Sequence, residues 1–226
     1  MLFPFMYVRG ACLRLALRVG DLWRSSDSGE ADIESVFSRI YKYNLWGNHE
    51  SVSGSYSTLS RTVRLRQELP ALIEEMNITS LLDAPCGDFN WMQHVDLNLD
   101  QYVGADVVPE LVATNRQKYG NGNREFTVLD ITQSKIPAVD LIMCRDCWIH
   151  FSHNDVTATI ANFKQSKSKY LLTTTYPGVH ENVEISTGQC RPLNLLLPPF
   201  GFPPPLKLIV EQPEIRGMGL WRLEDL

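Results

Sequence analysis

Charged side chains close four short apolar runs in this chain of 226 residues. Each run is typical of a buried strand of a parallel sheet and passes directly into a turn or a polar stretch. In open sheets of this kind, ligands bind outside the carboxyl ends of the strands. We therefore expect one binding site that gathers the charged residues at these ends, which are Asp83, Asp106, Asp130 and the pair Arg145 and Asp146.

The first run ends in a turn that is suited to holding a ligand against the backbone. Residues 83–87 read Asp-Ala-Pro-Cys-Gly, and Gly87 has no Cβ to keep a ligand away. The spacing from Asp83 to Asp106 matches dinucleotide folds, which place the acid that binds the ribose hydroxyls about 20 residues after the glycine turn. Asp106 is therefore the candidate for contact with a ribose.

The fourth run leads into a stretch that offers a proton acceptor. His150 follows Asp146 by four residues, and imidazole is the side chain whose ordinary pKa lies nearest neutrality. A carboxylate beside the ring would fix its tautomer and raise its pKa. We predict His150 as a catalytic base and Asp146 as its orienting partner, with a structural histidine as the alternative.

The same stretch also holds the residue types of a zinc site, at Cys144, Cys147, His150 and His153. Residues three apart on a helix are displaced by about 60° at each step, so four of them spread over half of its circumference. Zinc sites usually separate two ligand pairs by about a dozen residues. The pattern therefore predicts no metal site.

Helical and extended patterns alternate along the chain in the manner of an α/β fold. Helices are expected over residues 58–76, 90–95 and 109–119, with Pro70 either kinking the first helix or beginning a second one. Further strands are expected over 169–176, and over 206–211 and 219–225 as a closing pair. The sequence thus predicts a seven-stranded, mostly parallel, Rossmann-like sheet with helices on both faces and a C-terminal antiparallel hairpin.

A loop rich in Gly, Ser and Asn precedes the first strand, over residues 46–57. Backbone and hydroxyl groups of such a loop are able to surround a ligand. The loop is either a lid over the site, with Trp46, Ser53 and Gly54 as its contact residues, or a plain surface loop. We favour the lid.

The motif series DAPCGD, GADVVPE, VLDI and DLIMCRD resembles that of the class I S-adenosylmethionine (SAM) dependent methyltransferases. The resemblance covers residues 80–223 and departs from the family in having a single glycine in the first motif. It implies SAM as the cofactor. It also implies transfer of the methyl group to a small-molecule or glycan-type acceptor, through oxygen or nitrogen.

The resemblance further implies which part of SAM each motif contacts. The first motif would face the methionine part, the second the ribose and the third the adenine, while the loop after the fourth strand would face the methyl group. The cofactor-binding residues expected outside the lid are therefore Asp83, Ala84, Pro85, Cys86, Gly87, Asp106, Val107, Asp130, Ile131 and Arg145.

Two other functions remain open. A protein that binds SAM without catalysis would use the same motifs and would need no base. An NAD-dependent oxidoreductase would share the fold class, but it would be expected to carry a G-x-G-x-x-G turn where this chain has only Gly87.

The composition limits which partners and which cellular compartment are expected. The chain is 44% hydrophobic and 21% charged, with a formal net charge of −5, so nothing draws it toward phosphate backbones and nucleic acid is not an expected substrate. Five cysteines without framework spacing indicate a reducing compartment. These features predict a cytoplasmic enzyme.

Residues 1–32 form a separate N-terminal region in this interpretation. An amphipathic helix with Arg14, Arg18 and Asp21 on its polar face is expected over 11–23, followed by a polar linker. The helix either docks on the domain or makes a peripheral contact with a membrane or a partner. The methyltransferase domain then spans 33–226, with the lid and preceding helices in 33–79.

Overall fold

The structure is a computed structural model, and it describes residues 32–212 and 215–226. The amphipathic helix and most of the linker expected in residues 1–32 lie outside this part. Among the described residues, no helix is both long enough and apolar enough to cross a membrane.

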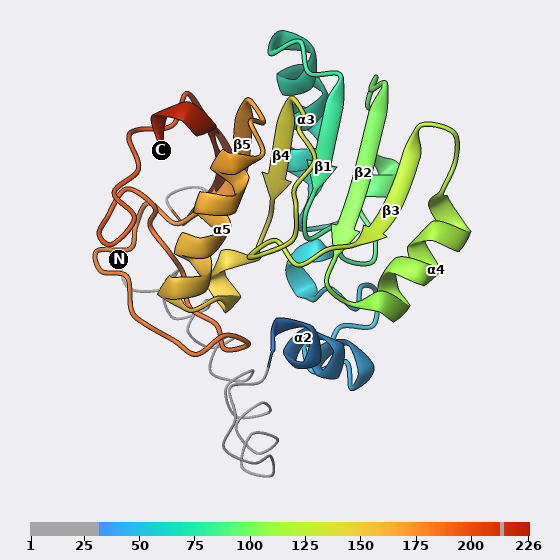
Figure 1. Cartoon of the computed structure of the whole chain (residues 1–226), viewed down its shortest axis with the longest axis horizontal. Helices are drawn as coiled ribbons and strands as arrows, with labels where there is room; N and C mark the ends of the chain where they lie inside the picture. The colour runs from blue at the N-terminus through green and yellow to red at the C-terminus, as the bar shows by residue number, and fades with distance from the viewer. Residues whose placement is uncertain (1–31, 213–214) are drawn as a thin grey trace.

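Seven strands form one sheet in the order β3-β2-β1-β4-β5-β7-β6 (Figure 1). The strands are β1 Ser80–Asp83, β2 Gln101–Asp106, β3 Arg124–Val128, β4 Leu141–Cys144, β5 Tyr170–Thr175, β6 Lys207–Gln212 and β7 Arg216–Arg222. The first five are parallel, and β7 pairs antiparallel with both β5 and β6. The predicted seven-stranded sheet with a C-terminal hairpin is confirmed.

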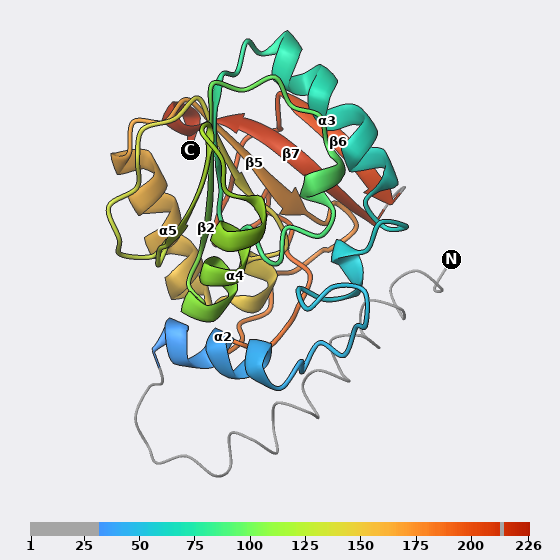
Figure 2. The ribbon, with the colours of Figure 1, turned by 90° about the vertical axis from the view of Figure 1, so that its right-hand side faces the viewer.

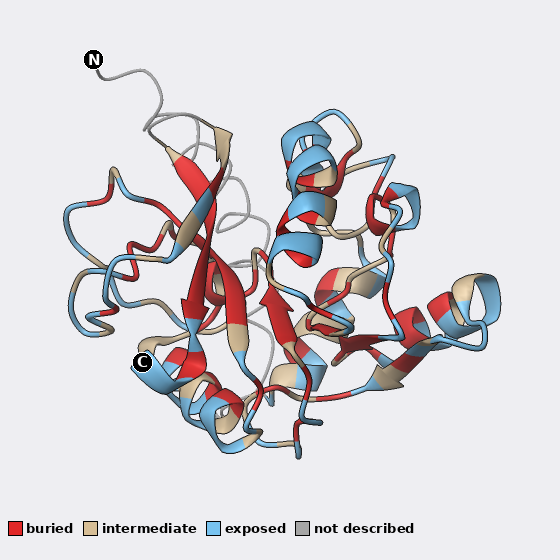
Figure 3. Ribbon diagram, turned by 90° about the horizontal axis from the view of Figure 1, so that it is seen from above, coloured by how far each residue is buried: buried red, intermediate tan, exposed pale blue. Residues whose placement is uncertain are grey.

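Helices cover both faces of this sheet because its central strands are apolar on both sides. On one face Leu81 of β1 packs with Leu69 of α3 (Val63–Glu75) and Val112 of α4 (Pro109–Tyr119). On the other face Leu82 packs with Phe163 of α5 (His153–Gln165). Figure 2 shows α3 and α5 on opposite sides, and Figure 3 shows buried residues concentrated along the strands.

Two expected helices differ from the observed ones. The helix expected over 58–76 is a single helix, Val63–Glu75, that continues through Pro70; Leu69 and Leu72 are buried on either side of it and offset the hydrogen bond that proline removes. The helix expected over 90–95 is only a 3₁₀ turn, Met92–His94, because the chain becomes extended at Val95.

The carboxyl ends of the parallel strands meet at one edge of the sheet. Helix α2 (Ile33–Lys42) lies across this edge (Figures 1 and 2). Its N-terminus is capped by Asp32, whose carboxylate accepts a hydrogen bond from the backbone of Ser35 at 2.9 Å. The fold therefore brings the carboxyl ends of the first four strands and helix α2 together at one edge of the sheet.

Candidate functional site

A cavity of about 450 Å³ lies at the carboxyl ends of the strands. Its walls come from α2, from the lid (residues 46–57) and from the loops that follow β1, β2, β3 and β4. Every site residue predicted from the sequence lines this cavity except Ala84. Ala84 is wrong as a contact residue because it is fully buried in the core, where its N–H donates to the carbonyl of Met143 at 2.9 Å.

Gly87 is required by the geometry of the loop after β1. Its φ is +56°, in the left-handed region that favours glycine, and a Cβ at this position would collide with Oγ of Ser53 in the lid. Its N–H donates to Oδ2 of Asp106 at 3.1 Å. The single glycine of this motif thus serves the close approach of the lid to the loop.

Asp106 closes β2 with its carboxylate held by backbone donors. Gly87 donates to Oδ2 and Val108 donates to Oδ1, each at 3.1 Å. Burial raises the pKa of this carboxyl to about 6. Each carboxylate oxygen has a second lone pair, so two acceptors remain side by side at the cavity wall, which is the arrangement that a vicinal diol requires.

Asp83 closes β1 and is paired with a phenol. The hydroxyl of Tyr102 donates to its Oδ2 at 2.5 Å. Burial raises the pKa of Asp83 to about 7, although the Tyr102 hydrogen bond and the charge of Arg145 act in the opposite direction. Asp83 therefore changes its charge near neutrality.

Asp130 shapes the turn after β3. Its Oδ1 accepts hydrogen bonds from the N–H and the hydroxyl of Thr132, at 2.9 and 2.7 Å, and its Oδ2 accepts one from Gln133 at 2.7 Å. The turn places both Asp130 and Ile131 in the cavity wall. The carboxylate of Asp130 therefore makes its hydrogen bonds within its own turn, and Ile131 adds an apolar surface to the cavity wall.

The lid is fastened to the β1 loop by Asp88, a residue that our sequence reasoning missed. Its carboxylate accepts hydrogen bonds from the hydroxyl of Ser51 at 3.0 Å and from the N–H of Val52 at 2.9 Å. Its N–H donates to Oγ of Ser53 at 2.9 Å. The available signal was an acid immediately after the glycine of the turn. Trp46, Ser53 and Gly54 line the cavity, so the segment forms part of its wall, and its role as a lid stays a prediction.

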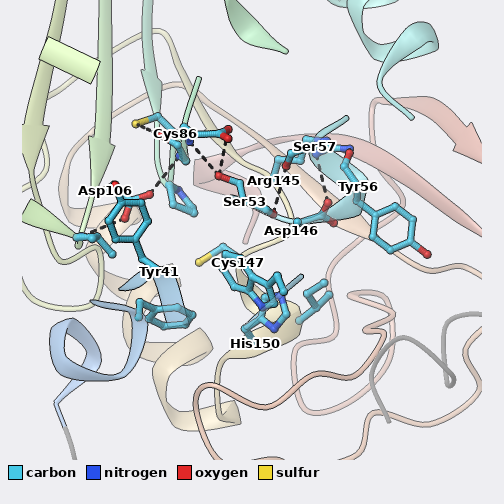
Figure 4. Close-up of a pocket in the computed structure, with 18 of the residues that line it drawn as sticks. Tyr41, Ser53, Tyr56, Ser57, Cys86, Asp106, Arg145, Asp146, Cys147 and His150 are labelled. Atoms are coloured by element: carbon cyan, nitrogen blue, oxygen red, sulfur yellow. Dashed lines mark hydrogen bonds and ion pairs between the residues drawn. The ribbon is translucent and has the colours of Figure 1, made fainter. Parts of the chain in front are cut away.

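His150 lies at the end of a 3₁₀ helix, Trp148–His150, in the loop after β4 (Figure 4). Its Nδ1 is 2.8 Å from the backbone carbonyl of Gln189, and its ring packs against Trp46 with centroids 5.3 Å apart. A carbonyl only accepts, so Nδ1 carries the hydrogen and Nε2 keeps a lone pair. Burial lowers the pKa of His150, which favours the neutral form of the ring.

Asp146 is not the hydrogen-bonding partner of His150, which corrects the prediction. Its carboxylate instead lies 2.5 Å from the guanidinium of Arg216 and 3.3 Å from that of Arg145. These arginines hold the pKa of Asp146 below its usual value. The predicted rise in the pKa of His150 is also wrong, because desolvation outweighs the attraction of Asp146.

Arg145 lines the cavity, but its guanidinium forms hydrogen bonds with other groups of the protein. Its guanidinium donates to Glu211 at 2.7 Å and to the carbonyl of Tyr56 at 2.9 Å. Glu211 also lies 2.9 Å from Arg216. The result is a compensated cluster of two arginines and two carboxylates, Arg145, Asp146, Glu211 and Arg216, beside the cavity. The sequence does not reveal it, since Glu211 and Arg216 come from β6 and β7.

Among the described residues, cysteines and histidines do not gather into a metal-binding cluster. No group of three or more His, Cys, Asp or Glu side chains in the described ranges is placed to hold a metal ion. Cys86, Cys144 and Cys147 are buried free thiols, whereas Cys190 is disulfide-bonded. The compartment therefore stays a prediction.

Comparison with known proteins identifies the fold of the chain. No protein-family model matches the chain, and no curated protein matches it by sequence. Human N-acetylserotonin methyltransferase, solved in complex with SAM, is similar with a TM-score of 0.61 at 13% identity, over 92% of this chain and 66% of that one. The chain has the fold of the class I SAM-dependent methyltransferases.

A second structure with this fold aligns over nearly its whole length. Magnesium protoporphyrin IX methyltransferase from Synechocystis PCC 6803, solved with bound SAM, has a TM-score of 0.51 and 14% identity, over 87% of this chain and 99% of that one. Identities this low bear on the fold alone. The chemistry must therefore be argued from the residues of the cavity.

Proposed function

We propose that this chain binds SAM in the cavity and transfers its methyl group to the oxygen or nitrogen of a small-molecule or glycan-type acceptor. The observation that carries the proposal is the pair of buried carboxyls, Asp83 and Asp106, at the neighbouring ends of β1 and β2. Their hydrogen bonds come from a neutral hydroxyl and from backbone N–H groups. Such carboxyls suit a ligand that brings positive charge and hydroxyl donors.

The residues present fit SAM part by part. Asp106 would accept from both ribose hydroxyls, Asp83 and Gly87 would face the methionine part, and Asp130 with Ile131 would face the adenine. The lid would exclude water. When bound, SAM supplies a methyl group activated by its sulfonium.

The loop after β1 disfavours NAD. A dinucleotide pyrophosphate is normally held at the N-terminus of the α-helix that follows the first strand. Here that position has a 3₁₀ turn, Met92–His94, and the carboxylate of Asp88 stands directly after Gly87. An anion would meet a negative charge where it needs donors.

The other half of the cavity has aromatic and apolar walls. These include Phe37, Trp46, Ile149 and Tyr176, and two charged residues of this half, Arg145 and Asp146, belong to the compensated cluster. A hydroxyl- or amine-bearing small molecule fits these walls, and a glycan-type acceptor offers the same nucleophile.

His150 would take the proton that the acceptor loses. The lone pair on Nε2 is available because Nδ1 carries the hydrogen. Methyl transfer to an alcohol or amine releases one proton from the attacking atom, and a positioned imidazole accepts it. Asp146 contributes by holding the loop through Arg216 and Arg145.

Calorimetric titration of the purified chain with SAM, its demethylated product and NAD tests the proposal. We expect the two sulfur ligands to bind and NAD to give no heat of binding. NAD binding without SAM binding would overturn the proposal in favour of an oxidoreductase.

Turnover separates an enzyme from a SAM-binding protein without catalysis. The chain is incubated with methyl-labelled SAM and pools of small phenols, alcohols, amines and oligosaccharides, and labelled products are identified by mass spectrometry. Labelled product from one pool, lost in His150→Gln, supports the enzyme. SAM binding without product from any pool would favour the non-catalytic alternative.

A further inference from the structure

A segment of the long β5–β6 connection, residues 183–191, wraps the short helix that carries His150. We call it the His150 clamp. The N–H of Arg191 donates to the carbonyl of Ile149 at 2.9 Å, and the N–H of Gly188 donates to the carbonyl of His150 at 2.8 Å. The carbonyl of Gln189 receives the Nδ1 hydrogen of His150. The clamp thus binds both the backbone and the ring of the proposed base.

Arg191 is the centre of this clamp. Its guanidinium donates to the carbonyls of Trp148 at 2.6 Å, Phe151 at 2.7 Å and Val183 at 3.0 Å. These bonds satisfy carbonyls on both sides of His150 and tie them to the clamp. Arg191 is only 5% exposed, so the frame around His150 is built around a buried cation.

The positive charge of Arg191 needs an explanation of its own. Within the described part of the chain, Arg191 forms no ion pair, and its bonds go to neutral carbonyls. Burying a cation is costly, and burial lowers the pKa of Arg191 to about 10, although the charge of Glu184 acts in the opposite direction.

The charge acts on His150. Two charged groups face the ring: Asp146 from the loop after β4 favours protonation, and Arg191 from the clamp opposes it. Trp46 packs on the ring and is neutral. Desolvation is the largest influence and lowers the pKa of His150; the hydrogen bond to Gln189 and the charge of Asp146 raise it, and the charge of Arg191 adds to the lowering.

We propose that Arg191 is a positioning residue for His150, which holds the carbonyl frame that fixes the Nδ1–H tautomer and leaves the Nε2 lone pair for the acceptor. Its charge also disfavours the imidazolium in the resting protein. The inference rests on the proposed function, because this tautomer matters only if His150 accepts a proton.

Nuclear magnetic resonance of the histidine rings in the full chain tests the inference without acceptor or cofactor. The His150 signal is assigned by its loss in His150→Gln, and its tautomer and titration are followed from pH 5 to pH 8. In Arg191→Gln we expect the pKa of His150 to rise and the tautomers to mix. In Arg191→Lys the charge remains, so we expect the pKa to stay near that of the parent while the tautomers mix.

Arg116→Gln is the matched control. Arg116 also donates from its guanidinium to a backbone carbonyl, that of Phe126 at 2.8 Å, but it does not line the cavity. We expect this variant to leave the His150 signal unchanged. A folded Arg191→Gln protein with the parent tautomer and titration would overturn the inference. If that variant does not fold, a parent-like tautomer in Arg191→Lys would overturn it.

A parallel titration with SAM keeps the two proposals apart. Arg191→Gln should bind SAM as the parent does, because Arg191 acts through His150. Failure of the parent to bind SAM would refute the proposed function. The role of Arg191 is tested separately, by the tautomer and the titration of the His150 ring. Once the acceptor is known, kcat of Arg191→Gln should fall by up to about 10²-fold, and the acid limb of its pH profile should move to higher pH.

Discussion

The two halves of the cavity hold aspartates whose pKa values are shifted in opposite directions. Asp83 and Asp106, at the ends of β1 and β2, are buried among neutral donors, and their pKa values are raised to about 7 and about 6. Asp146, after β4, is partly buried, with its side chain 16% exposed, and Arg216 and Arg145 lower its pKa. One half of the cavity is short of positive charge, and the other is already compensated.

This difference underlies the roles that we propose for the two halves of the cavity. A carboxyl whose charged form is disfavoured by burial gains most from a ligand that brings the missing charge. A carboxylate that is fixed between arginines gains little from a ligand but holds its loop in place. Under the proposed function, the β1–β2 half would bind the cationic cofactor, and the β4 half would position the base.

The largest expected effect is on turnover in the β4 half. His150→Gln should lower kcat by about 10² to 10⁴, because a positioned base contributes about that much, while SAM affinity stays at the parent value. The measurement is a rate with the acceptor found by labelling, beside a calorimetric titration. Full turnover in this variant would reduce His150 to a structural residue.

The second largest expected effect is on stability, which should differ between variants in the two halves of the cavity. Asp146→Asn leaves Arg216 with less compensation and should lower the free energy of unfolding by about 3–5 kcal/mol, as expected for a broken buried ion pair. Asp83→Asn replaces a buried carboxyl by a neutral group that still accepts from Tyr102, so at pH 8 it should cost little or stabilise. Urea denaturation of both variants measures the contrast. Equal losses would show that the halves are not differently charged.

Affinity for SAM should depend on the β2 carboxylate. Asp106→Ala removes charge-assisted hydrogen bonds worth about 1.5–3 kcal/mol each, so the dissociation constant should rise by at least about tenfold. Asp130→Ala is the matched control, because the carboxylate of Asp130 is spent on its own turn. We expect a smaller loss there, and an equal loss in both variants would contradict the ribose assignment.

The strand ends could be predicted from sequence because topology needs only local signals. Runs such as Leu81-Leu82-Asp83 mark a buried strand and its carboxyl end, and a parallel sheet brings these ends to one edge whatever the other residues are. Gly87 was predictable for the same reason. Its neighbour Asp88 was missed because its partners belong to the lid, more than 30 positions earlier in the chain.

The partners of the β4 loop were beyond local reasoning. The prediction paired Asp146 with His150 across four residues, but the structure pairs Asp146 with Arg216, 70 positions away. It orients His150 by the backbone carbonyl of Gln189, 39 positions away. A carbonyl has no residue type that a sequence motif could reveal. The direction of each pKa shift follows from such distant partners and from burial.

The smallest expected effect is the pH dependence of SAM binding. Asp83 and Asp106 have folded pKa values of about 7 and about 6, above the value near 4 of an unfolded aspartate. Their contribution to the stability of the free protein is therefore present below pH 4 and is lost as pH rises to 7. Above pH 7 both are ionised and attract a cation. SAM affinity should accordingly weaken as pH falls below 7, by at most about tenfold per pH unit for each proton taken up.

Thermal unfolding with and without SAM at pH 5.5 and pH 8 measures this dependence, since a ligand that binds only the folded state raises the melting temperature further the more tightly it binds. We expect the larger increase at pH 8. Asp83→Asn should flatten the change around pH 7, because the titrating carboxyl is gone, and should leave the part near pH 6 that belongs to Asp106. An increase that is constant, or larger at pH 5.5, would show that the β1–β2 half does not bind its ligand through these carboxylates, and the contrast with the β4 half would then lose its functional meaning.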